Sequence, residues 1–287
     1  MKYSLVICTH NRSRQLKLCL DSIFEMFKPD FFELVVIDNN SNDSTQDVIR
    51  SYQQRANFVF KSDIEFRKGL GFARNLGWKI SSGDIISFTD DDCYVDKYFA
   101  YDVLSAFEGR ENQGFLGGRV MLFDESDLRI TIIESSEFVF YHAGDFIPTG
   151  ALIGANLSFR RSALVSAQGF KDFLGAGTLL RSGEDSEILG NLSSLGWQGQ
   201  YSPCPTVFHH HGRKKQSDVI SLFKGYDIGR GAYYAIMMCR RNMFLQVCRH
   251  WWAKFSLYRY RRFFNELYGF FMGLFFYFNS IVRRILF

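Results

Sequence analysis

GLGFARNLGWKISSGDIISFTDDD, residues 69–92, is the stretch that decides the fold. Its Gly71–Ile80 part has the apolar spacing of a helix, which a Ser-Ser-Gly turn then ends. Asp84–Thr89 follows as a β-rich run, and three aspartates, Asp90–Asp92, come directly after it. A helix that leads into a buried strand is typical of a βαβ unit, and open α/β sheets bind ligands where such strands end.

The residues before this stretch show the same alternation. Apolar runs predict strands at Tyr3–Cys8, Glu33–Ile37 and Phe58–Phe60. Helical spacing predicts one helix from Leu16 to Phe27 and a second through Gln54. Runs such as LVVI and IISF lack polar alternation, as expected of parallel strands that are buried on both faces. We therefore expect an α/β fold with a mostly parallel central sheet flanked by helices.

Beyond residue 96 the pattern is less regular. Residues 115–160 are expected to form strands and loops, and SGEDSE, residues 182–187, should open a helix that runs to Leu195. Short strands are predicted at Trp197–Tyr201 and Thr206–Phe208, before three consecutive histidines, His209–His211.

Composition excludes several classes of protein. Of 287 residues, 47% are hydrophobic and 22% charged, which rules out a disordered or collagen-like chain. The six cysteines form no CxxC pair, so we expect free thiols in a reducing compartment. The apolar run at the N-terminus is too short for a signal peptide, so the chain is expected to start in the cytosol.

The net charge of +4 hides an asymmetry. Residues 1–212 hold 20 Lys/Arg and 27 Asp/Glu, whereas residues 213–287 hold 14 Lys/Arg and only 3 Asp/Glu. We therefore divide the chain into an acidic α/β domain, 1–212, and a basic, aromatic helical region, 213–287. A basic region of this kind is suited to a polyanionic surface.

Within the basic region, Leu267–Val282 is almost wholly apolar, but as a helix its 16 residues span only about 24 Å, less than the ~30 Å of a bilayer core. Arginines on both sides favour a helix that lies on an anionic membrane surface. They are Arg259, Arg261, Arg262, Arg283 and Arg284. A nucleic-acid surface is disfavoured because the apolar residues are too continuous, and a buried bundle is the alternative. The side chains expected to insert are Phe270, Phe271, Phe275, Phe276 and Phe278.

Three groups of residues could carry chemistry, and each has a structural alternative. Asp90–Asp92 could bind Mg²⁺ or Mn²⁺ through carboxylate oxygens, or form a solvated acidic turn. His209 and His211 should point to one side and His210 to the other, so they could complete a metal site or lie in an exposed basic turn. Glu184 and Asp185 could supply a general base or cap a helix.

Two further groups concern a nucleotide. Asp38 could accept a hydrogen bond from a base or ribose, or cap the segment that follows it. Residues 69–75, GLGFARN, lack the spacing of a P-loop, although Lys68 and Arg74 could face an anion.

Taken in order, these motifs resemble those of the family 2 glycosyltransferases, whose fold is called GT-A. SLVICTHNR (Ser4–Arg12) resembles the opening strand and loop of the family, and LVVIDNNSNDST (Leu34–Thr45) its second strand. Residues 69–92 resemble the stretch that ends in its DxD-type metal motif. GANLSFRR (Gly154–Arg161) and GEDSEILGNLSSLGW (Gly183–Trp197) resemble its acceptor-side strand and its ED motif. The resemblance runs to about His211, and the basic region resembles bacterial members with membrane-associated helices.

The resemblance implies roles for individual residues. Asp185 would be the general base, Asp92 a metal ligand, and His209 or His211 a further ligand, with His209 preferred. Asp90 would face the ribose and Asp38 the nucleotide base. The residues expected to bind substrate are Thr9, Asn11, Arg12, Asp38, Arg74, Asp90, Asp91, Asn156 and Glu184.

The function expected from the resemblance is an inverting glycosyltransferase. It would use Mn²⁺ or Mg²⁺ to move a sugar from a nucleotide-diphosphate sugar to a lipid-linked or membrane-near glycan, in assembly of a bacterial surface polysaccharide. It would lie peripherally on the cytoplasmic face of the inner membrane and bind no nucleic acid. The alternatives are a nucleotidyltransferase, which would want a basic glycine-rich loop after the first strand, and an inactive membrane-bound sugar-binding subunit. The sequence does not fix the oligomeric state.

Overall fold

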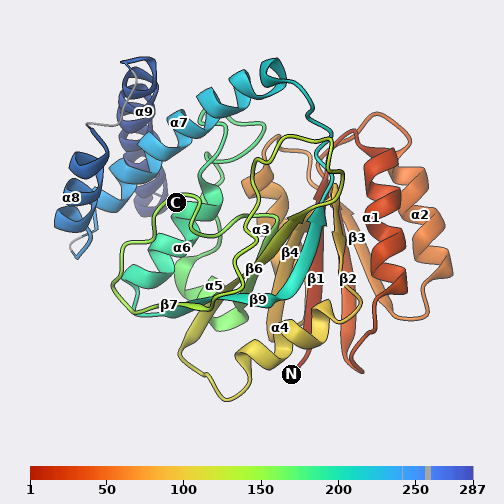
Figure 1. Cartoon of the computed structure of the whole chain (residues 1–287). Helices are drawn as coiled ribbons and strands as arrows, with labels where there is room; N and C mark the ends of the chain where they lie inside the picture. The colour runs from red at the N-terminus through yellow and green to blue at the C-terminus, as the bar shows by residue number, and fades with distance from the viewer. Residues whose placement is uncertain (241, 256–259, 287) are drawn as a thin grey trace.

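The computed structural model describes residues 1–240, 242–255 and 260–286. The first part of the chain alternates strands and helices as predicted (Figure 1). Its elements are β1 (Tyr3–Thr9), α1 (Ser13–Glu25), β2 (Phe32–Asp38), α2 (Thr45–Arg55), β3 (Val59–Ile64), α3 (Leu70–Ile80) and β4 (Ile85–Asp90).

The second part is less regular. Its elements are β5 (Cys93–Val95), α4 (Phe99–Phe107), β6 (Gln113–Leu122), β7 (Val139–Tyr141), β8 (Asn156–Arg160), α5 (Arg161–Ala167), α6 (Glu184–Ser194) and β9 (Gln198–His209). The two short strands predicted before the histidines are thus one strand, β9, which has an irregular register beside β6 between Gly118 and Arg119.

The central sheet is mixed, and this corrects the expectation of a mostly parallel one. Its strand order is β3-β2-β1-β4-β8-β6-β9-β5, with β7 on β9. Strands β3, β2, β1 and β4 are parallel, but β8 pairs antiparallel with both β4 and β6. The reason is that β8 follows the long connection from β6 and runs back between β4 and β6, without a helical crossover that would keep it parallel.

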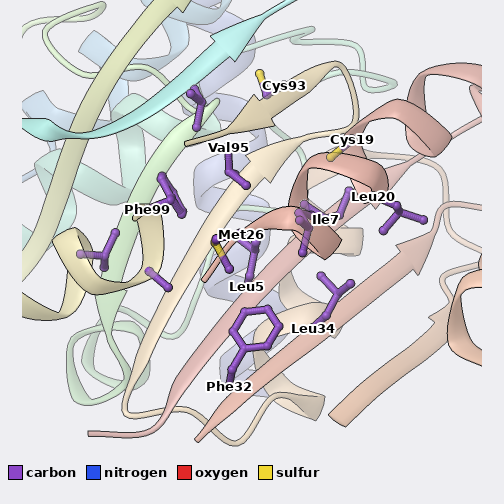
Figure 2. Close-up of a cluster of buried hydrophobic side chains, with 14 of the residues drawn as sticks. Leu5, Ile7, Cys19, Leu20, Met26, Phe32, Leu34, Cys93, Val95 and Phe99 are labelled. Atoms are coloured by element: carbon purple, nitrogen blue, oxygen red, sulfur yellow. The ribbon is translucent and has the colours of Figure 1, made fainter. Parts of the chain in front are cut away.

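The two faces of the sheet pack against different helices, which explains the continuous apolar runs. Leu5 and Ile7 point toward α1 and α4, with Leu20, Met26 and Phe99 around them (Figure 2). Val6, on the other face, joins a second core with residues of α3, α5 and α6. Because successive side chains in a strand point to opposite faces, every residue of such a strand must be apolar or hydrogen-bonded.

Glu33 is the main polar exception inside the sheet. It is only 4% exposed, and its carboxylate accepts hydrogen bonds from Ser4 Oγ and from the backbone and hydroxyl of Ser82. Lys61 Nζ lies 2.9 Å from Glu33 Oε2. Burial alone would raise the pKa of Glu33, but these donors lower it to about 2.

Replacing Glu33 with Gln is expected to lower the free energy of unfolding at pH 7 by about 3 kcal/mol. The folded pKa lies below the unfolded value, so the carboxylate stabilises the fold above about pH 4.5 and loses that effect as the pH falls toward 2. Chemical denaturation should therefore show a difference of about 3 kcal/mol between the wild type and Glu33→Gln at pH 7, and less than half of that difference at pH 3. The exposed Glu25→Gln is the control, and an equal loss in both variants would contradict this account.

Three helices, α7 (Gln216–Met238), α8 (Phe244–Phe255) and α9 (Tyr260–Leu286), lie together at one side of the molecule, away from α1 and α2 (Figure 1). They share an apolar core with Leu174 and Leu180 of the loop between α5 and α6. α7 and α9 approach closely because Gly231 faces the backbone of Glu266, where a Cβ atom would clash. Among the described residues, no helix is both long and apolar enough to cross a membrane.

Candidate active site

A cavity of about 380 Å³ lies where β1, β4 and β9 end, between α6 and α7. Its charged lining consists of Arg12, Arg74, Asp90, Asp92, Arg181, Glu184, Asp185, His209, Arg213 and Arg230. Small residues of the 149–155 segment form another wall. Since carboxylates, cations and a histidine converge on one hollow, we take this cavity as the candidate active site.

The acidic cluster does not present all three carboxylates to the cavity. Asp90 and Asp92 line it, whereas Asp91 points back and accepts a hydrogen bond from Thr9 Oγ1 at 2.7 Å. Arg12 joins the cluster, with Nη1 2.8 Å from Asp91 and Nη2 2.7 Å from Asp92. Burial raises the pKa of Asp91 to about 7 despite the nearby Arg12. Arg12 thus offsets the repulsion that three adjacent carboxylates would otherwise suffer.

The three histidines point as the alternation of a strand predicts. His209 Nε2 lies 3.4 Å from Asp92 Oδ1, so the end of β9 meets the turn that follows β4. His210 points the other way, and its Nδ1 lies 2.8 Å from the Tyr94 hydroxyl. His211 lies beside His209, but its Nδ1 accepts from the Arg213 amide and its Nε2 contacts the Leu128 carbonyl. His209 is therefore the histidine whose ring faces the aspartates.

A divalent cation fits the residues around Asp92. The ligand atoms of Asp92, Cys93 and His209 lie within 4.8 Å of one another. Burial raises the pKa of Cys93 well above its ordinary value, so its thiol stays protonated and is a poor ligand for a hard cation. A carboxylate with an imidazole suits Mn²⁺ better than Mg²⁺, which prefers oxygen ligands only.

The opposite side of the cavity is formed by the start of α6. Gly183, just before the first turn, has a φ of 97° and packs against the backbone of Gly229 in α7. Because a side chain at residue 183 would strain this conformation and crowd Gly229, glycine is required there. Asp185 follows, half-buried, with Oδ1 2.7 Å from the Ser186 amide. Its Oδ2 faces Gly154, where an added Cβ atom would lie 3.4 Å away. The other carboxylate oxygen of Asp185 is thus directed across the cavity, where a substrate can reach it.

Arg74 connects the two acidic groups. This buried guanidinium lies 3.0 Å from Glu184 and 3.5 Å from Asp90, and it donates to the Gly154 carbonyl. Burial and the neighbouring Asp185 charge raise the pKa of Glu184 to about 7, although Arg74 opposes this. Arg74 and Glu184 therefore position the site, while Asp185 is the accessible carboxylate at the start of α6.

Helix α7 forms part of the same cavity through Leu222, Tyr226 and Arg230. Arg230 is held by ion pairs to Asp227 and Glu266, and the fully buried Glu266 also accepts a hydrogen bond from Trp251 Nε1 at 3.1 Å. The basic region thus reaches the cavity through a charged network that joins all three of its helices. The boundary predicted at residue 212 marks a change in charge and composition. Residues from both sides of it line the cavity.

Several residues predicted to bind substrate do not line this cavity. Asn11 contacts the loop at Ser41 and Asn42, and Asp38 accepts from the Ser41 amide and from Gln46. The structure therefore gives Asp38 the capping contact that the sequence had left as an alternative. Asn156 donates to the carbonyls of Arg119 and Pro205, both at 2.9 Å, and so ties β8 to its neighbours. Their roles in substrate binding stay predictions.

Tyr226, Arg181 and Arg213 also line the site, but none of them was predicted from the sequence. Arg181 and Arg213 have no ion pair within the described part of the chain, although both line the cavity. Their positions in the sequence could have indicated these two arginines, because Arg181 directly precedes the SGEDSE motif and Arg213 closely follows the histidines. Tyr226 itself belongs to no motif.

Comparison with known proteins places this site in a family. The glycosyl transferase family 2 model matches residues 4–166, which is more than half of the chain. The chain belongs to glycosyl transferase family 2.

Individual relatives agree with this assignment. "Probable glycosyltransferase YdaM" of Bacillus subtilis is 23% identical over 296 residues, covering 100% of this chain and 66% of the relative. A validoxylamine A glucosyltransferase of Streptomyces hygroscopicus subsp. limoneus is 35% identical over 109 residues, which is 37% of this chain and 24% of that protein. The chain thus spans from a quarter to just under two thirds of the length of these relatives.

Solved structures share the fold. The mannosyltransferase PcManGT from Pyrobaculum calidifontis, in complex with GDP-Man and Mn²⁺, matches with a TM-score of 0.66 and 14% identity, covering 95% of this chain and 85% of that one. Residues 1–349 of TarS from S. aureus, in complex with UDP, match with a TM-score of 0.62 and 18% identity, covering 96% and 81%. The predicted GT-A architecture is confirmed at the level of fold.

Proposed function

We propose that this chain is an inverting glycosyltransferase that moves a sugar from a nucleotide-diphosphate sugar to a hydroxyl of a glycan acceptor. The observation that carries the proposal is one cavity lined by Asp92 and His209 on one side and Asp185 on the other. A nucleotidyltransferase has no need of a base placed across the cavity, and an inactive subunit has no need of either group.

Asp185 would remove the proton from the acceptor hydroxyl as that oxygen attacks the anomeric carbon. It is half-exposed to the cavity, and the Ser186 amide at 2.7 Å fixes its other oxygen. Because attack on one face displaces the nucleotide diphosphate from the other, a single carboxylate base suffices and the configuration inverts.

The leaving diphosphate needs positive charge near it. Arg12, Arg74 and Arg230 are engaged by carboxylates, so Arg181 and Arg213 are the cavity arginines available for phosphate oxygens. A divalent cation held by Asp92 and His209 would supply further positive charge to the diphosphate. The nucleotide base, which Asp38 was predicted to contact, would lie on the β1 and β2 side of the cavity.

The proposal predicts donor-dependent release of nucleotide diphosphate. The full chain, incubated with bacterial membranes, Mn²⁺ and a panel of UDP-, GDP- and dTDP-sugars, should release the diphosphate of one donor well above its hydrolysis in buffer. Membranes alone are the control. Release of pyrophosphate from a nucleoside triphosphate, with no release from any sugar nucleotide, would favour the nucleotidyltransferase instead.

We further propose that the acceptor is lipid-linked and that the protein lies peripherally on the cytoplasmic face of the bacterial inner membrane. Support comes from α9, where a stripe of exposed side chains repeats at intervals of four and three residues: Phe264, Tyr268, Phe271, Phe275, Phe278 and Val282, each at least 48% exposed. We call these residues the α9 stripe. Such a face suits the interface of a membrane that also attracts the basic region.

Two of the five phenylalanines expected to insert do not belong to the stripe. Phe270 stacks on Trp251 with ring centroids 5.3 Å apart, and Phe276 stacks on Phe173 at 5.8 Å. They hold α9 against the rest of the protein. Of the flanking arginines, Arg259 lies outside the described residues, as do the side chains of Arg283 and Arg284.

Changing Phe264, Phe271 and Phe278 together to Ser is expected to weaken binding to anionic vesicles on the order of 100-fold, since each inserted ring contributes about 1 kcal/mol or more. Flotation of the full chain with such vesicles measures this. The matched control changes three exposed phenylalanines elsewhere, Phe31, Phe138 and Phe140. Equal flotation of both variants would reject the α9 stripe as the membrane contact, and diphosphate release from donor should persist in either variant.

A further inference from the structure

A second cavity, of about 670 Å³, lies apart from the candidate active site. We call it the α3–α9 cavity, because it is bounded by α3, by the 168–179 segment and by the last part of α9. The same segment continues into the candidate active site, which Ala176 and residues 181–186 line. Nothing in the proposed transfer reaction uses the α3–α9 cavity.

One wall of the α3–α9 cavity is basic. Lys68, Lys79 and Lys171 line it, and Asp172 is the only acidic residue among the described residues of the lining. Lys68 and Lys79 are exposed, and within the described part of the chain neither ammonium group makes an ion pair. The charge of Lys79 is partly balanced by Glu65, whose pKa it helps to lower, but no carboxylate forms an ion pair with Lys68 or Lys79 in the described part of the chain. Two such ammonium groups beside a hollow of this size favour an anionic ligand.

The remaining lining combines polar side chains, such as Asn75 and Asn279, with a group of aromatic ones. Phe72, Phe170, Phe173, Phe275 and Phe276 line the cavity. Phe276 and Phe173 stack with their rings 15° from parallel, so this surface is fixed by packing. Phe275 is 59% exposed and belongs both to the cavity wall and to the α9 stripe. The cavity therefore opens beside the face that we propose for the membrane.

We propose that the α3–α9 cavity binds one anionic phospholipid of the membrane, with its phosphate headgroup at Lys68 and Lys79 and its acyl chain along the phenylalanines. A free phosphate would use only the basic wall, and a neutral lipid only the aromatic one. The combination of both walls, continuous with the α9 stripe, fits a molecule that is anionic at one end and apolar at the other. This inference rests on the proposed membrane contact and adds to it a defined lipid site.

Native mass spectrometry of the full chain in a neutral detergent, titrated with short-chain phosphatidylglycerol, tests the site. The wild type should bind one lipid, and Lys68→Ala with Lys79→Ala should weaken that binding about tenfold or more, since each Lys beside an anionic headgroup contributes several-fold. Lys17→Ala with Lys97→Ala removes the same charge from exposed positions outside the cavity and should leave binding unchanged. Asn279→Trp, which fills the cavity without changing charge, should weaken binding as well.

Two further ligands separate the alternatives. Short-chain phosphatidylcholine should bind weakly, and inorganic phosphate should not compete at concentrations that match the lipid. Equal binding of both lipids, or equal loss in the two lysine pairs, would overturn the inference. Donor binding, measured on the same samples, should be the same in all variants. Failure of the wild type to bind any sugar nucleotide would instead reject the proposed function. The lipid titration would still accept or reject the lipid site, because it does not depend on donor binding.

Discussion

Asp185→Asn is expected to lower kcat by about 10²–10⁴-fold, the usual cost of losing a general base. Asparagine keeps an oxygen for the Ser186 amide at 2.7 Å, so the first turn of α6 should retain its geometry. Only the capacity to accept the acceptor's proton is removed. Steady-state kinetics with a fixed donor should show the loss in kcat, while titration calorimetry should show donor affinity within about twofold of the wild type.

The control for Asp185→Asn is Asp47→Asn. Asp47 also lies in the first turn of a helix, α2, but is exposed and outside the cavity. It tests whether removing a negative charge from a helix N-terminus is by itself harmful. If Asp185→Asn lost donor affinity and turnover in parallel, Asp185 would be a structural residue at the start of α6.

Asp92→Asn is expected to abolish measurable turnover, as is an excess of chelator. Asp92 is buried and lies between Arg12 at 2.7 Å and His209 at 3.4 Å. Burial acts to raise its pKa, but the contacts with His209 and Arg12 hold that pKa below its ordinary range, so the carboxylate is ionised and available to a cation. Mn²⁺ binding, followed by loss of the electron paramagnetic resonance signal of free Mn²⁺, should weaken strongly in Asp92→Asn.

The histidines supply a matched set of variants. His209→Ala should weaken Mn²⁺ binding, whereas His210→Ala, which removes a neighbouring ring that points to Tyr94, should leave it unchanged. His211→Ala removes a ring held by Leu128 and Arg213 and should affect stability more than metal affinity. Full activity in excess chelator, or equal effects of His209→Ala and His210→Ala, would contradict the metal site.

The first half of the fold could be predicted because local signals and tertiary packing agree there. LVVI and IISF are continuous apolar runs, and they form β2 and β4 in the interior of the sheet. The position of Asp90–Asp92 at the end of β4 and the opposite directions of His209 and His210 follow from strand geometry alone. Strand direction after β4 could not be predicted, because it depends on a long connection whose residues have no periodicity.

The site was predicted less completely than the fold. Motifs identify residues with distinctive spacing, such as Asp92 and Asp185, but not side chains that enter the cavity from a distant helix, such as Tyr226. Nor could the sequence show that Arg12 would bridge two aspartates, since this contact joins residues 80 apart in the chain. In the same way, Asn156 was assigned to the acceptor from its motif, while its amide is engaged by two backbone carbonyls.

The most direct test of the proposed function is a proton NMR time course of the full chain with its preferred sugar nucleotide, Mn²⁺ and acceptor. The experiment follows the anomeric proton of the donor and that of the product together. We predict that the donor signal decays as a product signal of the opposite anomeric configuration grows in equal amount, and that Asp185→Asn slows both changes. A product with the donor's own configuration, or donor loss with no glycosidic product, would contradict a transfer that uses Asp185 as its single base.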